Sequence, residues 1–223
     1  MVQRILVWDL PTRISHWLLV LSFSGAFLTG DSERWQDLHV LFGYTMLGLL
    51  VFRMVWGVIG SRYVRFVALV LMSPYIGDYL VQLIKGGAWR PVGHNPVGAV
   101  FIFLLLSLGI VTGVSGWAVY EDIGGDGIEK LHDYISYAML MMICMHIAGV
   151  VVLSCLQREN LIMAMITGRK RREEPKQAIS SNHALIAILL LTAITVCWCC
   201  LWPDSRDMNW FFVTGRQLLK FTN

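Results

Sequence analysis

The sequence predicts an all-α integral membrane protein, built as a four-helix transmembrane bundle with an additional transmembrane helix toward the C-terminus. Three observations support this fold class. Hydrophobic residues make up 56% of the 223 residues and charged residues only 15%, whereas soluble domains carry about 25% charged residues. Five apolar segments approach or exceed the length of about 20 residues that a bilayer requires. The loops between these segments alternate between basic and acidic.

The apolar segments define the domain organisation. The expected transmembrane helices are residues 14–30, 38–59, 97–120, 131–156 and 184–203. The first four belong to a membrane domain over residues 1–172, which is followed by a linker over 173–183, the fifth helix and a periplasmic tail over 204–223. The first segment is followed by charged sequence and lacks a small-residue cleavage site, so we expect it to be an uncleaved span rather than a signal peptide.

The loop charges predict the orientation of the chain. Residues 1–15, 61–95 and 157–182 hold twelve of the 18 basic residues, whereas residues 31–37 and 121–130 hold two basic and seven acidic residues. The positive-inside rule then places the N-terminus and the basic loops in the cytoplasm. The net charge of +3 is too small to indicate nucleic-acid binding. We therefore expect a multi-pass protein of the bacterial cytoplasmic (inner) membrane.

Residues 66–86 are apolar but do not form a clean sixth span. They contain Pro74 and Asp78 and end in Lys85. A sixth crossing would reverse every later helix and place the basic segment at 169–172 outside. We expect an amphipathic helix from about Pro74 to Lys85 that lies in the membrane interface.

Four histidines fall within or close to the predicted spans. His132 and His146 are fourteen residues apart, which is nearly four helical turns and a rise of about 21 Å, so they share one face of the fourth span. His16 lies near the cytoplasmic end of the first span and His39 near the outer end of the second. By depth, His16 therefore matches His146, and His39 matches His132.

Histidine is costly in lipid and indicates function there. A zinc site would need further ligands or an open water position. Two imidazoles on facing helices, repeated at two depths, instead suit the two axial positions of haem iron. The alternative is that the histidines only form hydrogen bonds between helices. We expect two b-type haems, one held by His16 and His146 and the other by His39 and His132.

Several sequence segments resemble a known family. VWDLPTRISHW, LHVLFGYTMLGLLVFRMVWGVIGSRYVRF, GHNP and RENLIMAMITGRKR are similar to the bacterial cytochrome b561 and nickel-iron hydrogenase b-type cytochrome family. The resemblance covers about residues 5–172 and implies a dihaem b-type cytochrome of four core helices. It implies the same pairing of the four histidines. The fifth span and the tail lie beyond the matched pattern.

Three further polar residues are candidates for the site. Arg53 lies fourteen residues after His39 and can pair with a haem propionate or extend to the interface. Arg13 has the same two possibilities. Asn95 precedes Pro96 and can cap the third span. Related membrane cytochromes of formate dehydrogenases suggest a quinone site at this position, where an amide can bind a quinone carbonyl. His94 is an alternative ligand at the depth of the His16 pair.

The expected function is electron transfer across the membrane between quinone or quinol and a periplasmic redox partner. The partner would be a c-type cytochrome, a hydrogenase or another redox enzyme, so we expect an electron-transfer subunit rather than a stand-alone enzyme. One alternative is a superoxide:quinone oxidoreductase, but the acidic outer loops disfavour an anionic substrate. The other alternative is a haem-free membrane scaffold, whose purified form would show no Soret band.

Overall fold

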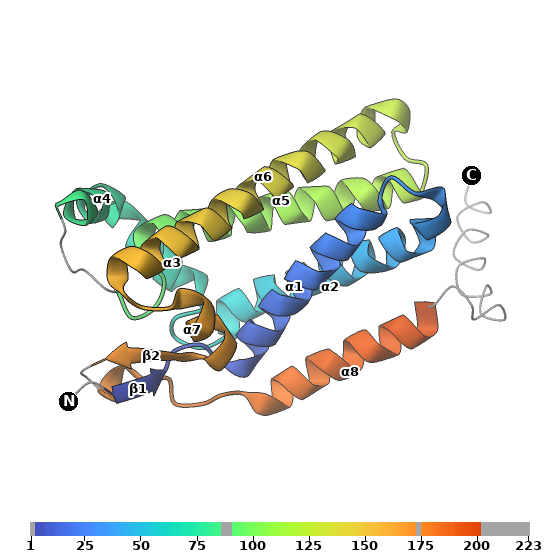
Figure 1. Cartoon of the computed structure of the whole chain (residues 1–223). Coiled ribbons are helices and arrows are strands. Elements are labelled where there is room, and N and C mark those ends of the chain that lie inside the picture. The colour runs from blue at the N-terminus through green and yellow to red at the C-terminus, as the bar shows by residue number, and fades with distance from the viewer. Residues whose placement is uncertain (1–2, 86–90, 173–174, 202–223) are drawn as a thin grey trace.

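The structure is a computed structural model that describes residues 3–85, 91–172 and 175–201. The described part is mainly helical, as predicted, with one small two-stranded ribbon (Figure 1). The predicted periplasmic tail, residues 204–223, lies outside the described residues.

Four long helices form the bundle, and they correspond to the first four predicted spans. They are α1 (Leu10–Thr29), α2 (Gln36–Ile59), α5 (Pro96–Tyr120) and α6 (Gly125–Gln157). Helices α1 and α2 are joined through a 3-10 turn, η1 (Glu33–Trp35), and α5 and α6 through residues 121–124. In Figure 1 the α1–α2 pair lies beside the α5–α6 pair, with all four axes roughly along one direction.

Two helices begin earlier than their apolar segments. Helix α1 starts at Leu10 and α6 at Gly125, whereas the apolar runs predicted starts at 14 and 131. The reason is that a helix continues through polar first turns, which hydropathy does not register. Asp9 caps α1 by accepting a hydrogen bond from the Thr12 amide at 2.9 Å.

Among the described residues, α2, α5, α6 and α8 (Ala184–Leu201) are long and apolar enough to cross a membrane. Helix α1 does not belong to this group, because Arg13, His16 and several hydroxyl residues lower its hydropathy. It nevertheless runs antiparallel along α2. Asp9 bonds Trp56 at one end of this pair, and His39 bonds the Ala26 carbonyl at the other.

The segment between α2 and α5 starts and finishes at the same end of the bundle. Its helices are α3 (Phe66–Met72), the 3-10 turn η2 (Ser73–Tyr75) and α4 (Ile76–Ile84). Helices α3 and α4 meet at 62°. The Gln157 amide, at the last residue of α6, donates to the Tyr79 hydroxyl of α4 at 3.0 Å. Helices α2 and α5 are antiparallel neighbours that meet at Leu50 and Gly109, so this segment does not reverse the later helices.

A short two-stranded ribbon joins two segments that are far apart in the sequence, residues 3–6 and 169–172. Strand β1 (Gln3–Leu6) pairs antiparallel with β2 (Arg169–Arg172), which follows α7 (Leu161–Thr167). Gly168 between α7 and β2 has φ +78°, and an added Cβ would lie 2.6 Å from the Trp8 carbonyl oxygen, so only glycine fits. The sequence did not predict these strands.

The expected linker is held against the rest of the protein over the part that the structure describes. It contains a 3-10 turn, η3 (Pro175–Gln177), and the Ile179 amide donates to the Leu6 carbonyl at 2.9 Å. Helix α8 then packs on α1 and α2. The Trp198 indole donates to the Thr45 hydroxyl of α2 at 2.9 Å, and its ring meets Phe42 at 5.4 Å.

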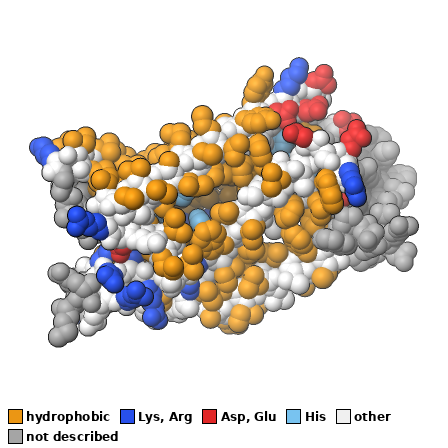
Figure 2. Space-filling model, in the orientation of Figure 1, with side chains coloured by type: hydrophobic (Ala, Val, Ile, Leu, Met, Phe, Trp, Pro, Cys, Tyr) orange, Lys and Arg blue, Asp and Glu red, His pale blue; other side chains and the backbone are white. Residues whose placement is uncertain are grey.

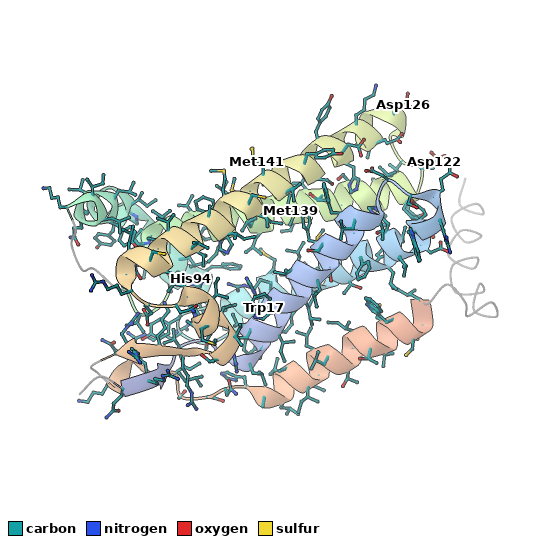
Figure 3. All side chains as sticks on the ribbon, viewed as in Figure 1. Trp17, His94, Asp122, Asp126, Met139 and Met141 are labelled. Atoms are coloured by element: carbon teal, nitrogen blue, oxygen red, sulfur yellow. The ribbon has the colours of Figure 1, made fainter. Side chains whose placement is uncertain are left out.

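The two ends of the bundle differ in charge. Figure 2 shows arginine and lysine side chains gathered at one end and aspartate and glutamate at the other, with an apolar surface between them. We call them the basic end, where β1, β2 and α7 lie, and the acidic end, which holds the α1–α2 and α5–α6 turns. Asp122 and Asp126 mark the acidic end in Figure 3, and His94 lies near the basic end.

Candidate functional site

The structure brings two of the predicted histidines face to face at the acidic end. His39 of α2 and His132 of α6 have ring centroids 6.1 Å apart and ring planes at 89°. A metal–imidazole bond is about 2 Å long, so two such bonds and the radii of two five-membered rings give a centroid separation of about 6 Å. The two rings are therefore close enough together for both to bind one metal ion.

Hydrogen bonds orient both rings. The His39 Nδ1 atom bonds the Ala26 carbonyl oxygen at 2.8 Å, and the His132 Nδ1 atom bonds the Thr112 carbonyl oxygen at 3.1 Å. Because a carbonyl oxygen only accepts, each Nδ1 carries the proton and each Nε2 keeps a free lone pair. This second bond is the usual way in which proteins fix the tautomer of a metal-binding histidine.

The space around this pair suits a flat cofactor. A cavity of about 330 Å³ is lined by His39, His132 and glycines of α2 and α5, a volume typical of ligand sites. An added Cβ on Gly43 would meet nothing within 4 Å, whereas one on Gly116 would lie 2.8 Å from His132 Cε1. Gly43 therefore borders open space, and Gly116 makes room for the imidazole.

The second predicted pair lies nearer the basic end. His16 of α1 and His146 of α6 are close enough for their charges to interact. The Nδ1 atom of His16 is buried without a hydrogen-bond partner among the described residues, and the His146 ring lies 6.4 Å from that of Phe101. Figure 2 shows histidine side chains inside a hollow of the apolar face. His39 and His132 thus face each other, and the charges of His16 and His146 interact, so the structure is compatible with the predicted pairs.

An apolar layer fills the bundle between the two histidine levels. It consists of buried side chains from all four helices: Phe23, Met46, Leu50, Leu106 and Met139. Figure 3 places Met139 midway between the acidic-end aspartates and His94. This layer keeps water and ions away from the space between the two sites.

Arg53 is buried inside the protein rather than extended to the interface. Its exposed fraction is 8%, its Nη2 donates to the Val64 carbonyl at 3.3 Å and its guanidinium lies 5.5 Å from the Phe66 ring centre. Its Nη1 is buried without a partner among the described residues, and its charge reaches His16. A buried guanidinium with an unused donor beside a histidine pair suits an anionic group such as a carboxylate.

Arg13 makes different contacts. Its Nη1 donates to the Ile166 carbonyl at 2.8 Å and its Nη2 to the Asn182 side-chain oxygen at 3.5 Å. These bonds tie α1 to α7 and to the chain before α8. Its Nε is buried without a partner among the described residues, so a propionate contact of Arg13 also stays a prediction.

Asn95 caps α5, as one of its two expected roles requires. Its Oδ1 accepts from the Gly98 amide at 2.7 Å. The ring of the neighbouring His94 packs 4.4 Å from that of Trp8, and its charge also interacts with that of His146, so the alternative of His94 as a ligand stays a prediction. Burial, together with the nearby charges of Arg53 and Lys170, lowers the pKa of His94 to about 3, so the imidazole stays neutral.

Sequence reasoning missed Asp9 and its partner Trp56. Asp9 is fully buried, and the Trp56 indole donates to its carboxylate at 3.2 and 3.3 Å. Its negative charge also acts on the buried guanidinium of Arg53. The signal was present in the sequence, because aspartate followed by proline two residues later is a normal helix start.

The residues fit b-type haem. The candidate ligands are imidazoles on facing helices, glycines border open space, and a buried guanidinium has an unused donor. Haem iron, when bound by such imidazoles, changes between two oxidation states and carries one electron. In the described residues no group of three or more His, Cys, Asp or Glu side chains is arranged to hold a metal ion by itself.

Comparison with known proteins agrees with this chemistry. Residues 7–168 match the family described as prokaryotic cytochrome b561. The chain is 20% identical over 210 residues to a probable Ni/Fe-hydrogenase B-type cytochrome subunit of Rhodobacter capsulatus, covering 74% of this chain and 80% of that protein. It is 21% identical over 215 residues to a protein of the same description from Rhizobium leguminosarum bv. viciae, covering 75% and 89%. No solved structure gives a significant match. Because the family match spans most of its length, the chain belongs to the prokaryotic cytochrome b561 family and is a multi-pass membrane b-type cytochrome of electron transfer.

Proposed function

We propose that this cytochrome holds two b-type haems and transfers electrons across the membrane between quinone or quinol and a redox partner at the acidic end. The observation that carries the proposal is the facing pair His39 and His132, whose Nδ1 atoms are both bound to main-chain carbonyls. His16 and His146 supply a second pair on the same bundle. The pairs are about 21 Å apart along α6, so together they can span most of the hydrocarbon layer.

The protein residues have distinct parts in this proposal. The four histidines would hold the irons, and the apolar layer around Met139 excludes water between the sites. Arg53 places a buried positive charge beside His16 and can pair with a propionate. A positive charge favours the more negative, reduced state of the nearby site, so Arg53 would raise the midpoint potential of the basic-end site.

The acidic end is the proposed docking side for the partner. The relatives carry the name of a hydrogenase cytochrome subunit, so a hydrogenase, a c-type cytochrome or another periplasmic redox enzyme is the proposed partner. The cavity at His39 is bordered by Asp31, Glu129 and Asp133. These carboxylates favour a basic protein surface and disfavour superoxide, which weighs against the oxidoreductase alternative.

Pyridine haemochrome analysis of the purified protein tests the haem content. Two haems per chain are expected, because two separate imidazole pairs are present. One haem or none per chain would contradict the proposal, and the absence of any Soret band would favour the haem-free scaffold.

The proposed orientation puts the basic end in the cytoplasm of a bacterium, at the inner membrane, with the N-terminus inside. Reporter fusions after Arg172 and after Gly124 test it. A reporter active only in the cytoplasm should work after Arg172, and one active only in the periplasm should work after Gly124. Periplasmic activity of the Arg172 fusion would reverse the orientation.

The proposed quinone site lies at the basic end beside Asn95. Two substitutions separate a quinone contact from the capping role. Asn95→Leu removes both the capping oxygen and the amide donor, whereas Asn95→Ser keeps a capping oxygen and lacks the amide NH₂ group. Quinol should reduce the haems more slowly in both variants if the amide binds quinone. Wild-type kinetics in Asn95→Ser would leave Asn95 as a helix cap only.

A further inference from the structure

A second cavity lies at the basic end, away from both histidine pairs. It has a volume of about 730 Å³ and lies between β1, β2, α7 and the end of α6. Six cationic side chains line it: Arg4, Arg158, Arg169, Lys170, Arg171 and Arg172. Glu159 is the one acidic side chain among the described lining residues. We call this space the basic cavity.

Two of the six cationic side chains are already bound to acceptor groups of the protein. Arg172 forms an ion pair with Glu159 at 3.1 Å and donates to the Pro91 carbonyl at 3.0 Å. Lys170 donates to the Gly93 carbonyl at 3.0 Å. These two side chains belong to the buried face of the ribbon, because the side chains of a strand alternate between its faces. The single described acid of the cavity is thus already paired.

The other face of the ribbon carries three exposed arginines. Arg4, Arg169 and Arg171 are exposed, and the strand register places Arg4 directly opposite Arg171. Like charges directly opposite each other on neighbouring strands destabilise a sheet. A two-stranded ribbon is only marginally stable by itself, so this arrangement calls for an anion that neutralises both guanidinium groups.

Arg158 adds a fourth cation, although its backbone conformation is unfavourable for an arginine. It ends α6 in the left-handed conformation, with φ 51°. A residue with a Cβ pays roughly 1 kcal/mol there, and glycine is the usual choice. The sequence places arginine at this position, and its side chain lines the basic cavity. A strained residue at a cavity is the kind of observation that indicates a ligand.

The surroundings of the cavity indicate the source of the anion. Helix α7 exposes Ile162, Met163 and Ile166, with exposed fractions of 44%, 50% and 49%, and Met163 also lines the cavity. Exposed apolar side chains beside arginines are typical of a segment in the membrane interface. A free phosphate ion would use the arginines and leave this apolar surface unused. A phospholipid uses both.

We propose that the basic cavity binds the phosphate headgroup of an anionic phospholipid, with Arg4, Arg158, Arg169 and Arg171 around the phosphate and the acyl chains against α7. The bound lipid would stabilise the β1–β2 ribbon, which joins the N-terminus to the segment between α7 and α8. The proposal needs only that the basic end lies at a membrane surface. It does not rest on the number of haems or on a quinone site.

Native mass spectrometry of the full-length protein in neutral detergent tests the proposal. Dioleoyl phosphatidylglycerol is compared with dioleoyl phosphatidylcholine, which has the same acyl chains and no net charge. The test variant is Arg4→Gln/Arg171→Gln. The matched control is Arg65→Gln/Lys85→Gln, which removes two exposed cations of the basic end that do not line the cavity.

We expect wild-type protein to bind one phosphatidylglycerol in preference to phosphatidylcholine. A basic residue near an anionic lipid contributes about fivefold in affinity, so the test variant should bind about thirtyfold more weakly and the control nearly normally. Equal binding of the two lipids, or equal losses in the test and control variants, would overturn the proposal. Displacement of the lipid by a millimolar excess of inorganic phosphate would also overturn it, and would identify a free phosphate site.

Thermal unfolding provides a second measurement that tests folding separately. Without lipid, Arg4→Gln/Arg171→Gln should be at least as stable as wild type, because it lacks the repulsion between the strands. Phosphatidylglycerol should then raise the Tm of wild type and raise that of the variant much less. A variant less stable than wild type in the absence of lipid would show that the arginines stabilise the ribbon by themselves, against the proposal.

Discussion

Replacing Gly116 with alanine should disturb the acidic-end histidine pair through a single methyl group. The added Cβ would lie 2.8 Å from His132 Cε1, whereas ordinary contacts begin near 3.4 Å. The imidazole must therefore move by about 0.6 Å. Metal–ligand distances in proteins vary by only about 0.2 Å, so this displacement is about three times what an axial bond tolerates.

The hydrogen bonds of His132 oppose the movement. Its Nδ1 atom lies 3.1 Å from both the Thr112 carbonyl oxygen and the Ser115 hydroxyl oxygen. A shift of about 0.6 Å away from α5 would stretch these distances to about 3.7 Å, beyond the range of a hydrogen bond. Overpacking of this kind costs about 1–3 kcal/mol. The protein should still fold, and the main effect should be a displaced His132 imidazole.

Absorption and electron paramagnetic resonance spectra of the purified protein measure this effect. In Gly116→Ala we expect one of two low-spin haems to become partly high-spin, with its midpoint potential changed and the other haem unaffected. Gly127→Ala is the matched control, because an added Cβ there meets nothing within 4 Å. Two unchanged low-spin haems in Gly116→Ala would refute the assignment of His132 as a ligand in the position that the structure gives it.

Two further predictions concern the basic-end pair. His146→Ala should render one haem high-spin or remove it, and adding His16→Ala should change the spectrum little more. Adding His39→Ala instead should damage the second haem, because the two sites are about 21 Å apart along α6. A folded His16→Ala/His146→Ala protein without either haem would contradict the pairing. Arg53→Gln should lower one haem midpoint potential by roughly 40 mV, the equivalent of about 1 kcal/mol. Arg53→Lys, which keeps the positive charge, should have potentials close to those of wild type. Redox titrations that show two unchanged potentials in Arg53→Gln would argue against a charge beside that haem.

The positions of the helices and the predicted histidine pairing follow from local properties of the sequence. Apolar runs of 20 or more residues exclude other structures in lipid, because each main-chain polar group must find a partner within its own helix. The rise per residue then fixes the depth of His132 and His146 on α6, and depth predicts a partner for each. The cap at Asn95 is equally local, since its bond reaches three residues along the chain.

Other features depend on residues that are far apart in the sequence. The pairing of residues 3–6 with 169–172, the bond from Arg13 to Ile166 and the contact of Trp198 with Thr45 each join segments separated by more than 150 residues. Hydropathy and helical periodicity describe only residues that are near each other in the sequence, so they did not predict the ribbon or the docking of α8. The same limit left Arg53 undecided between the interface and the interior.

The sequence by itself therefore determined the class of the fold, the four core helices and the two histidine levels, because these depend on apolar length and helical rise. Only the tertiary structure decided how the polar groups at the basic end are used. It buries Arg53 beside His16, ties Arg13 to α7 and places Arg4 opposite Arg171. The physical reason is that a buried or paired charge is defined by its neighbours in space, and the folded chain brings those neighbours together from distant segments.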